Sequence, residues 1–110
     1  MSRDAMEIIQ GTLEMLILRS LVRGERHGWD VLCWLRERAG RELSLEEGAI
    51  YPALHRLEGK GLITSEWGLS ENNRRARYYQ LTDRGQSELG RQSETWTRYV
   101  RVIGRILGEA

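Results

Sequence analysis

Three arginines lie close together in the second half of the chain, at Arg74, Arg75 and Arg77. The segment 74–84 carries four arginines and one aspartate, a local charge of +3 in a chain whose formal total is +1. Guanidinium groups gathered in this way neutralise phosphates, since each one donates several hydrogen bonds in a fixed plane. A solvated edge strand also carries charge, which discourages aggregation, and composition alone does not separate these two interpretations.

A second group of candidate residues lies upstream, in a segment predicted to be helical. If Ile50, Leu54 and Leu57 face the core, the opposite face of the helix is small, aromatic and basic. That face and its flanks hold Ala49, Tyr51, Pro52, His55, Arg56, Gly59 and Lys60. Such a face suits a DNA groove better than a membrane, which requires a broad apolar face.

Each of these residues has an expected role. We expect phosphate contacts from the three clustered arginines and from Tyr51 and Lys60, and base contacts from His55 and Arg56, with Arg56 directed to guanine. Pro52 lies on the same face, while His55 has the alternative of being an ordinary polar surface residue.

Chemistry of other kinds finds little support in the sequence. The single cysteine, Cys33, excludes an internal disulfide framework and a cysteine-based zinc cluster. His27 has no second histidine or carboxylate four residues away, so it is expected to fix a local turn and not to bind metal. The chain shows no glycine-rich phosphate loop and no nucleophile elbow. We therefore predict a protein that is not an enzyme and has no metal or cofactor.

Composition places the chain among ordinary globular domains, with 40% hydrophobic and 30% charged residues. No stretch approaches the ~18 consecutive apolar residues that a membrane span requires. The start of the chain, residues 1–4, carries an acid early and lacks an apolar secretory core, so a cytoplasmic location with no membrane partner is expected.

The elements that position the candidate residues follow from caps, periodicity and turn signals. Thr12 is a plausible first cap, the run Ser44-Leu45-Glu46-Glu47 resembles a capping box with Glu46 as an alternative cap, and Thr82 caps the last helix. Pro52 is expected to cause a kink or an early start. The predicted helices are 13–22, 29–39, 44–59 and 82–107, and the predicted strands are 62–67 and 74–81.

The last helix carries an apolar seam suited to packing against another helix. Leu89, Trp96 and Ile103 repeat every seven residues, and Val100 and Leu107 fill intervening positions. The first helix is apolar nearly all round, which indicates that a partner chain covers part of it. The predicted dimer interface consists of Leu16, Leu89, Trp96, Val100, Ile103 and Leu107.

Several other apolar residues are expected inside the chain. Trp29 and Trp34 are interpreted as core residues, and Cys33 as a small buried one. Tyr78 and Tyr79 alternate across a strand, so one of the two is expected to pack inward.

Three helices followed by a hairpin form the layout of a winged helix-turn-helix, in which the third helix enters the major groove. The predicted fold class is therefore mainly α with a two-stranded β wing, followed by a C-terminal dimerisation helix. The predicted divisions are 1–81 for the DNA-binding domain and 82–110 for the dimerisation helix.

The sequence also resembles the PadR family of transcriptional regulators. The resemblance rests on 51–58 (YPALHRLE) leading into 61–63 (GLI), on 74–79 (RRARYY) with the following Leu81-Thr82 and Gly85, and on 27–30 (HGWD), where the family more often has Tyr at position 29. It spans about residues 10–89 and implies a dimeric DNA-binding repressor of the short form, with one C-terminal helix. The outer face of the third helix has few long basic side chains, so affinity is expected to depend on the wing.

The resemblance also suggests that Trp96 could stack against a planar aromatic effector between subunits, as an alternative to simple interface packing. The predicted function is a dimeric repressor that occupies a pseudo-palindromic operator, blocks a promoter and is released by a small aromatic or hydrophobic effector. Two alternatives remain: a winged helix that docks a protein partner without specific DNA binding, and a sensor of aromatic compounds that does not bind DNA.

Overall fold

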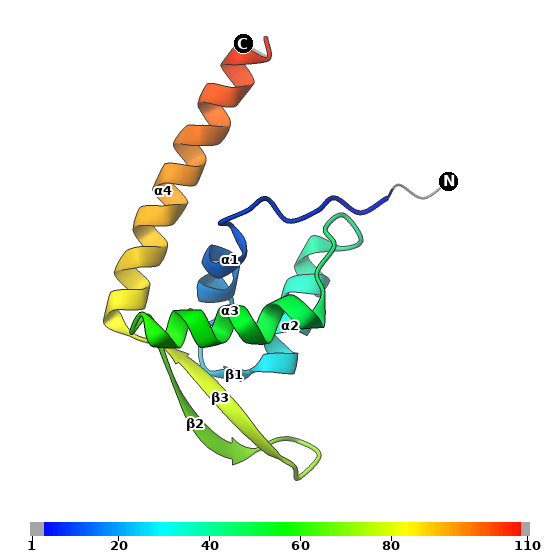
Figure 1. Ribbon diagram of the computed structural model, residues 1–110, viewed down its shortest axis with the longest axis vertical. Helices are drawn as coiled ribbons and strands as arrows, with labels where there is room; N and C mark the ends of the chain where they lie inside the picture. Colours follow the sequence, from blue (N-terminus) through cyan, green and yellow to red (C-terminus); the bar gives the residue numbers. More distant parts are fainter. Residues whose placement is uncertain (1–3, 109–110) are drawn as a thin grey trace.

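The computed structural model of the chain describes residues 4–108. It is mainly helical with a small antiparallel sheet, and its last helix projects away from the remaining elements (Figure 1). In chain order the elements are α1 (Leu13–Ser20), β1 (Arg26–His27), α2 (Gly28–Ala39), α3 (Glu47–Gly59), β2 (Ile63–Leu69), β3 (Arg75–Leu81) and α4 (Asp83–Ile106).

The helix starts differ in how they are capped. The Thr82 hydroxyl accepts a hydrogen bond from the Gly85 amide at 2.9 Å, which confirms the predicted cap of α4. Thr12 precedes α1, but its hydroxyl donates to the Ile9 carbonyl instead of capping the helix. The capping box at Ser44 is wrong, because α3 begins at Glu47 after the alternative cap position Glu46, whose side chain makes no cap hydrogen bond.

The predicted role of His27 as a local turn residue is confirmed. Its Nδ1 atom accepts a hydrogen bond from the Asp30 amide at 3.1 Å and so caps the start of α2.

Helix α3 continues through Pro52, which lies in its interior. Helix α1 ends at Ser20, two residues before its predicted end.

The sheet has three strands, in the order β1-β3-β2, so the prediction of a two-stranded wing was incomplete. Strand β1 pairs with β3 at Arg26 and His27, opposite Tyr79 and Tyr78. Two residues are too few for an alternating pattern, which is why the sequence did not predict β1. The long hairpin β2–β3 turns at Asn73, whose positive φ of 60° suits an asparagine.

The core lies between the three short helices and the base of the hairpin. Its buried side chains are mostly leucine and isoleucine, and include the predicted core face of α3. They are Ile17, Leu18, Leu21, Val31, Leu32, Leu35, Leu45, Ile50, Ala53, Leu54, Leu57, Leu62, Ile63, Tyr79 and Leu89. Tyr79 is thus the inward-facing member of the tyrosine pair, as one of the two was expected to be.

Two expectations about buried residues were wrong. Trp29 is 50% exposed and lies in the first turn of α2, where it lines a concave surface together with Tyr51 and the hairpin. Cys33 is only half-buried. Trp34 is also half-buried, but it packs against the core as expected. The core face of α2 consists instead of Val31, Leu32 and Leu35.

The segment before α1 is extended and attached to the loop between α2 and α3. Met6 donates its amide to the Glu42 carbonyl and accepts from the Ser44 amide, both at 2.8 Å. Residues 1–3, on which part of the location prediction rested, lie outside the described residues. Within residues 4–108, no helix is both long enough and apolar enough to cross a membrane.

Candidate nucleic-acid interface

In the wing, which is the hairpin formed by β2 and β3, two of the clustered arginines lie against a tryptophan ring. Trp67 in β2 lies opposite Arg77 in β3, and Leu69 lies opposite Arg75, so these four side chains share one face of the hairpin. The guanidinium carbons of Arg75 and Arg77 lie 4.5 Å and 5.3 Å from the centre of the Trp67 ring. Trp67 remains 56% exposed. The ring therefore orders both cations while leaving them at the surface.

A short hydrogen-bond chain connects this face of the wing to α3. Arg77 donates from Nε to the Ser65 hydroxyl at 2.7 Å, and Ser65 donates to Glu58 Oε2 at 2.6 Å. Glu58 belongs to α3, while Ser65 belongs to β2. Because these two hydrogen bonds connect the helix to the hairpin, they fix the position of Arg77 relative to α3.

The outer face of α3 is exposed, as the helical pattern predicted. Its exposed residues include Tyr51, Pro52, His55 and Arg56, and Lys60 is exposed directly after the helix ends. The two cations of this face, however, have an internal partner that sequence spacing did not indicate. Both pair with Glu14 of α1, Arg56 Nε at 3.0 Å and Lys60 Nζ at 2.9 Å.

Ionisation of Glu14 reflects this double contact. Partial burial opposes its charge, but the hydrogen bonds from Lys60 and Arg56 outweigh burial and lower the pKa of its carboxyl group below the ordinary value. The charge of α3 is therefore partly compensated within the chain, in contrast to the charge of the wing.

Tyr51 is held by the first residue of α2. A Cβ atom added at Gly28 would lie within 3 Å of Tyr51 ring atoms, so only glycine leaves room for the ring. Burial, together with the nearby Glu47 carboxylate, raises the pKa of the Tyr51 phenol. The hydroxyl stays protonated at neutral pH and is available as a hydrogen-bond donor to phosphate.

A concave surface of about 860 Å³ joins the start of α2, Tyr51 and the hairpin. Three predicted residues from the hairpin, Arg74, Arg75 and Arg77, line it together with Tyr51. Pro52, His55, Arg56 and Lys60 do not line it, and lie further along α3. Two members of this surface, Trp29 and Trp67, were not predicted from the sequence. Their spacing from the arginines gives no signal unless the strand register is known.

The apolar seam of α4 divides into a covered base and an uncovered end. Leu89 is 8% exposed and belongs to the core of its own chain, and Leu16 of α1 packs against that core. Trp96 and Ile103 are half-buried, while Val100 and Leu107 are exposed. Trp96 stacks on Tyr99, with ring centres 6.0 Å apart, beside a cavity of about 360 Å³ between α4 and the segment before α1.

A metal centre is not visible among the described residues. Residues 4–108 contain no group of three or more histidine, cysteine or acidic side chains placed to hold a metal ion.

Comparison with known proteins identifies the family. The model of the PadR-like family of transcriptional regulators matches residues 17–91, which include α2, α3, the hairpin and the first turns of α4. This chain belongs to that family.

Several relatives agree with this assignment. The Bacillus subtilis negative transcriptional regulator PadR is 34% identical over 77 residues, which cover 70% of this chain and 42% of that protein. A transcriptional regulator from Mycobacterium tuberculosis is 32% identical over 84 residues, covering 76% of this chain and 74% of that one.

Solved structures of other transcriptional regulators share this fold. The crystal structure of a PadR family transcription regulator from Clostridium difficile is 32% identical, with a TM-score of 0.78, and covers 89% of this chain and 100% of that one. A transcriptional regulator from Clostridium thermocellum is 29% identical, with a TM-score of 0.80 over 88% of this chain and 94% of that one. The PadR-like chain described here thus has the winged-helix DNA-binding fold of transcription regulators.

Proposed function

We propose that this PadR-like protein is a sequence-specific repressor that binds a pseudo-palindromic operator as a homodimer. The observation that carries the proposal is the concave surface on which Arg75 and Arg77 stack on Trp67 next to the exposed face of α3. Residues 1–81 would bind DNA, and residues 82–110 would form the dimer. The name of the Bacillus subtilis relative, a negative regulator, supports the repressor role.

The contacts divide by element. Arg74, Arg75 and Arg77 of the hairpin bind phosphates and supply most of the affinity, with Tyr51 and Lys60 adding phosphate contacts. His55 and Arg56 of α3 contact base edges in the major groove, alongside Pro52. A two-fold dimer then places two copies of α3 about one DNA turn apart, so the half-sites are centred ~10 base pairs apart.

The dimer forms through the uncovered seam of α4. Trp96, Val100, Ile103 and Leu107 pack against a second copy together with Leu16, while Leu89 anchors α4 to its own domain. Leu107 is 73% exposed in the single chain, which is unusual for a leucine on a regular apolar repeat. Trp96→Ala is expected to weaken the dimer by about 3 kcal/mol, measured by sedimentation equilibrium. An unchanged dissociation constant would remove Trp96 from the interface.

Regulation follows from the same helix. Repression occurs by occlusion of the promoter, and an aromatic or hydrophobic effector stacking on Trp96 changes the angle between the two α4 helices. That change alters the distance between the half-sites and releases DNA. The stacked Trp96–Tyr99 pair beside a cavity supports this role.

Selection of the purified protein against random duplex DNA, followed by sequencing, tests the function. The expected result is an inverted repeat with half-sites about one turn apart, bound with a strong salt dependence: ~10³-fold or more loss of affinity between 50 and 200 mM salt for six to ten phosphate contacts. Recovery of no motif, with weak binding, would contradict the proposal and favour a winged helix that docks a protein partner.

A further inference from the structure

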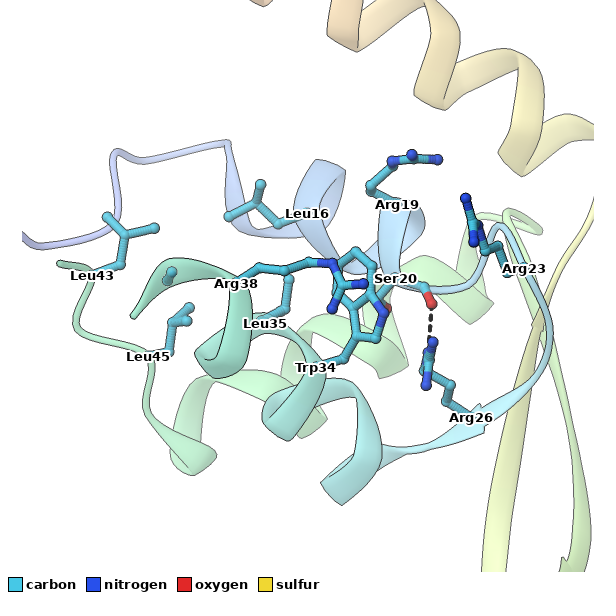
Figure 2. Close-up of a pocket in the computed structure, with 11 residues that line it drawn as sticks. Leu16, Arg19, Ser20, Arg23, Arg26, Trp34, Leu35, Arg38, Leu43 and Leu45 are labelled. Carbon is cyan, nitrogen blue, oxygen red and sulfur yellow. Dashed lines mark hydrogen bonds between the residues drawn. The ribbon is translucent and has the colours of Figure 1, made fainter. Parts of the chain in front are cut away.

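A separate cavity of about 530 Å³ lies between α1 and α2, on residues that do not line the proposed DNA surface. Figure 2 shows its two ends: Leu43 and Leu45 lie toward one, and Arg23 and Arg26 lie toward the other. Trp34 and Arg38 lie between them, with Arg19 above. The whole lining is Leu16, Arg19, Ser20, Arg23, Arg26, Trp34, Leu35, Arg38, Ala39, Leu43 and Leu45.

The charged side chains that line this cavity are all positive. Four arginines line it and, within the described part of the chain, no acidic side chain does. Among the contacts of residues 4–108, Arg19, Arg23 and Arg38 take part in no ion pair. Arg26 donates to the Ser20 carbonyl at 2.7 Å and pairs with Asp30, which lies outside the lining, at 3.3 Å. Several guanidinium groups thus lack an anionic partner in a chain of net charge +1.

The apolar residues of the cavity limit the shape of the apolar part of any anion that binds there. Leu35, Leu43 and Leu45 offer an apolar wall. The Trp34 ring is not a free stacking platform, because Arg38 lies 3.7 Å and Arg26 5.5 Å from its centre. The walls therefore favour an aliphatic or compact apolar body on the leucines over a flat base that needs an open ring face.

The geometry points to a binding site for an amphipathic organic anion, with a carboxylate held by Arg19, Arg23 and Arg26 and an apolar body along the leucines. The volume falls within the range of about 300–1,000 Å³ that is usual for small-molecule sites. Arginine binds carboxylates with paired, charge-assisted hydrogen bonds. Among the contacts of residues 4–108, Arg19 and Arg23 have no such partner, and Arg26 has only its contact with Asp30. The site does not depend on the proposed DNA interface.

Asp30 is an internal competitor for this carboxylate. It already holds one guanidinium nitrogen of Arg26, and the bound ligand would have to share or displace that contact. Removing the Asp30 charge is therefore expected to tighten ligand binding, whereas removing arginine charge is expected to weaken it. The opposite signs separate a specific site from general adsorption to apolar surface.

Calorimetric titration of the full-length protein with octanoate tests the inference. We expect saturable binding that weakens with salt, about tenfold weaker in Arg19→Gln/Arg23→Gln, and two- to threefold tighter in Asp30→Asn. Arg98→Gln is the matched control, because Arg98 is exposed on α4 and lines no cavity described here. Neutral 1-octanol should bind far more weakly, and inorganic phosphate should compete poorly.

Three results would overturn the inference. Equal binding of octanoate and octanol would show that the arginines do not hold the carboxylate. Equal binding by the Arg19/Arg23 double variant and by Arg98→Gln would place octanoate elsewhere. Loss of octanoate binding as rising protein concentration drives dimer formation would assign the groove to a second copy of the chain.

Discussion

The wing and α3 both carry exposed cations, but they hold them in different ways. On the wing, Arg75 and Arg77 lie on the ring of Trp67, and within residues 4–108 neither takes part in an ion pair. On α3, Arg56 and Lys60 both pair with Glu14. In the proposed complex, the wing therefore has charge available for phosphates, whereas α3 exchanges a carboxylate contact for a DNA contact.

This difference suggests a division of labour between the two elements. Free cations on a preorganised surface provide affinity that is independent of sequence, because phosphates are alike at every base pair. Cations that must first leave an internal partner contribute little net affinity, so α3 is suited to discrimination through His55 and Arg56.

The largest effect is expected from removing the charge of the wing. Arg75→Ala/Arg77→Ala should lower affinity for every duplex about a hundredfold at low salt, roughly tenfold for each charged hydrogen-bonding group. The salt slope should fall by about two units, one for each lost phosphate contact. Fluorescence anisotropy over a salt series measures both, with Arg101→Ala, an exposed α4 arginine, as control. If the double variant instead lost its preference at a single base pair, the assignment of Arg75 and Arg77 to phosphate contacts would be wrong.

A smaller effect is expected from removing the platform beneath these arginines. Trp67→Ala leaves both charges in place but deletes the ring on which they stack, so affinity should fall about fivefold, in line with exposed cation–π contacts. Trp67→Phe keeps an aromatic face and should retain most of the affinity. If Trp67→Ala bound DNA like the unaltered protein, the ring would not position the arginines for binding.

On α3 the predicted change has the opposite sign. Glu14→Gln releases Arg56 and Lys60 from their shared carboxylate, so DNA affinity should rise about threefold, a gain typical of a solvent-exposed ion pair. The same anisotropy titration measures it, with Glu94→Gln on α4 as a control for net charge. A loss of affinity would mean that Glu14 positions the two cations for DNA and does not compete with it.

The smallest effect concerns pH and stability. The pKa of Glu14 is lowered in the folded chain by Lys60 and Arg56, from an ordinary value of 4.5. A lowered folded pKa stabilises the protein above the unfolded pKa, and that contribution is lost as pH falls through the folded pKa. Both cations are more than half exposed, so the contribution stays below about 1 kcal/mol.

Urea unfolding of the wild type and Glu14→Gln at several pH values measures this contribution. The wild type should be more stable at pH 6, and the difference between the two proteins should shrink steadily below pH ~4.5. A difference that stayed constant down to the lowest pH would show that the ion pairs do not stabilise the fold.

Local signals in the sequence were sufficient for most of the fold. Thr82 capped α4 as predicted, and the apolar period of α3 placed Ile50, Leu54 and Leu57 in the core. The family assignment followed from motifs that lie on α3 and the hairpin. These features depend on residues close together in the chain, where spacing determines geometry.

The features that escaped prediction depend on contacts between distant segments. Glu14 meets Arg56 and Lys60 across 42 and 46 positions, which no periodicity reveals. Trp67 joins the arginines only through strand register, and β1 is too short to show alternation. Trp29 was assigned to the core by its apolar character, although tertiary packing leaves it on the surface.

The central claim is that the wing supplies affinity and α3 supplies discrimination. The most direct test measures the affinity of three proteins, the wild type, Arg75→Ala and His55→Ala, for the selected operator and for a scrambled duplex. We predict that Arg75→Ala weakens binding to both duplexes equally, whereas His55→Ala weakens binding to the operator and leaves the scrambled duplex unchanged. The reverse pattern, with discrimination lost in the wing variant and retained in the α3 variant, would contradict the account.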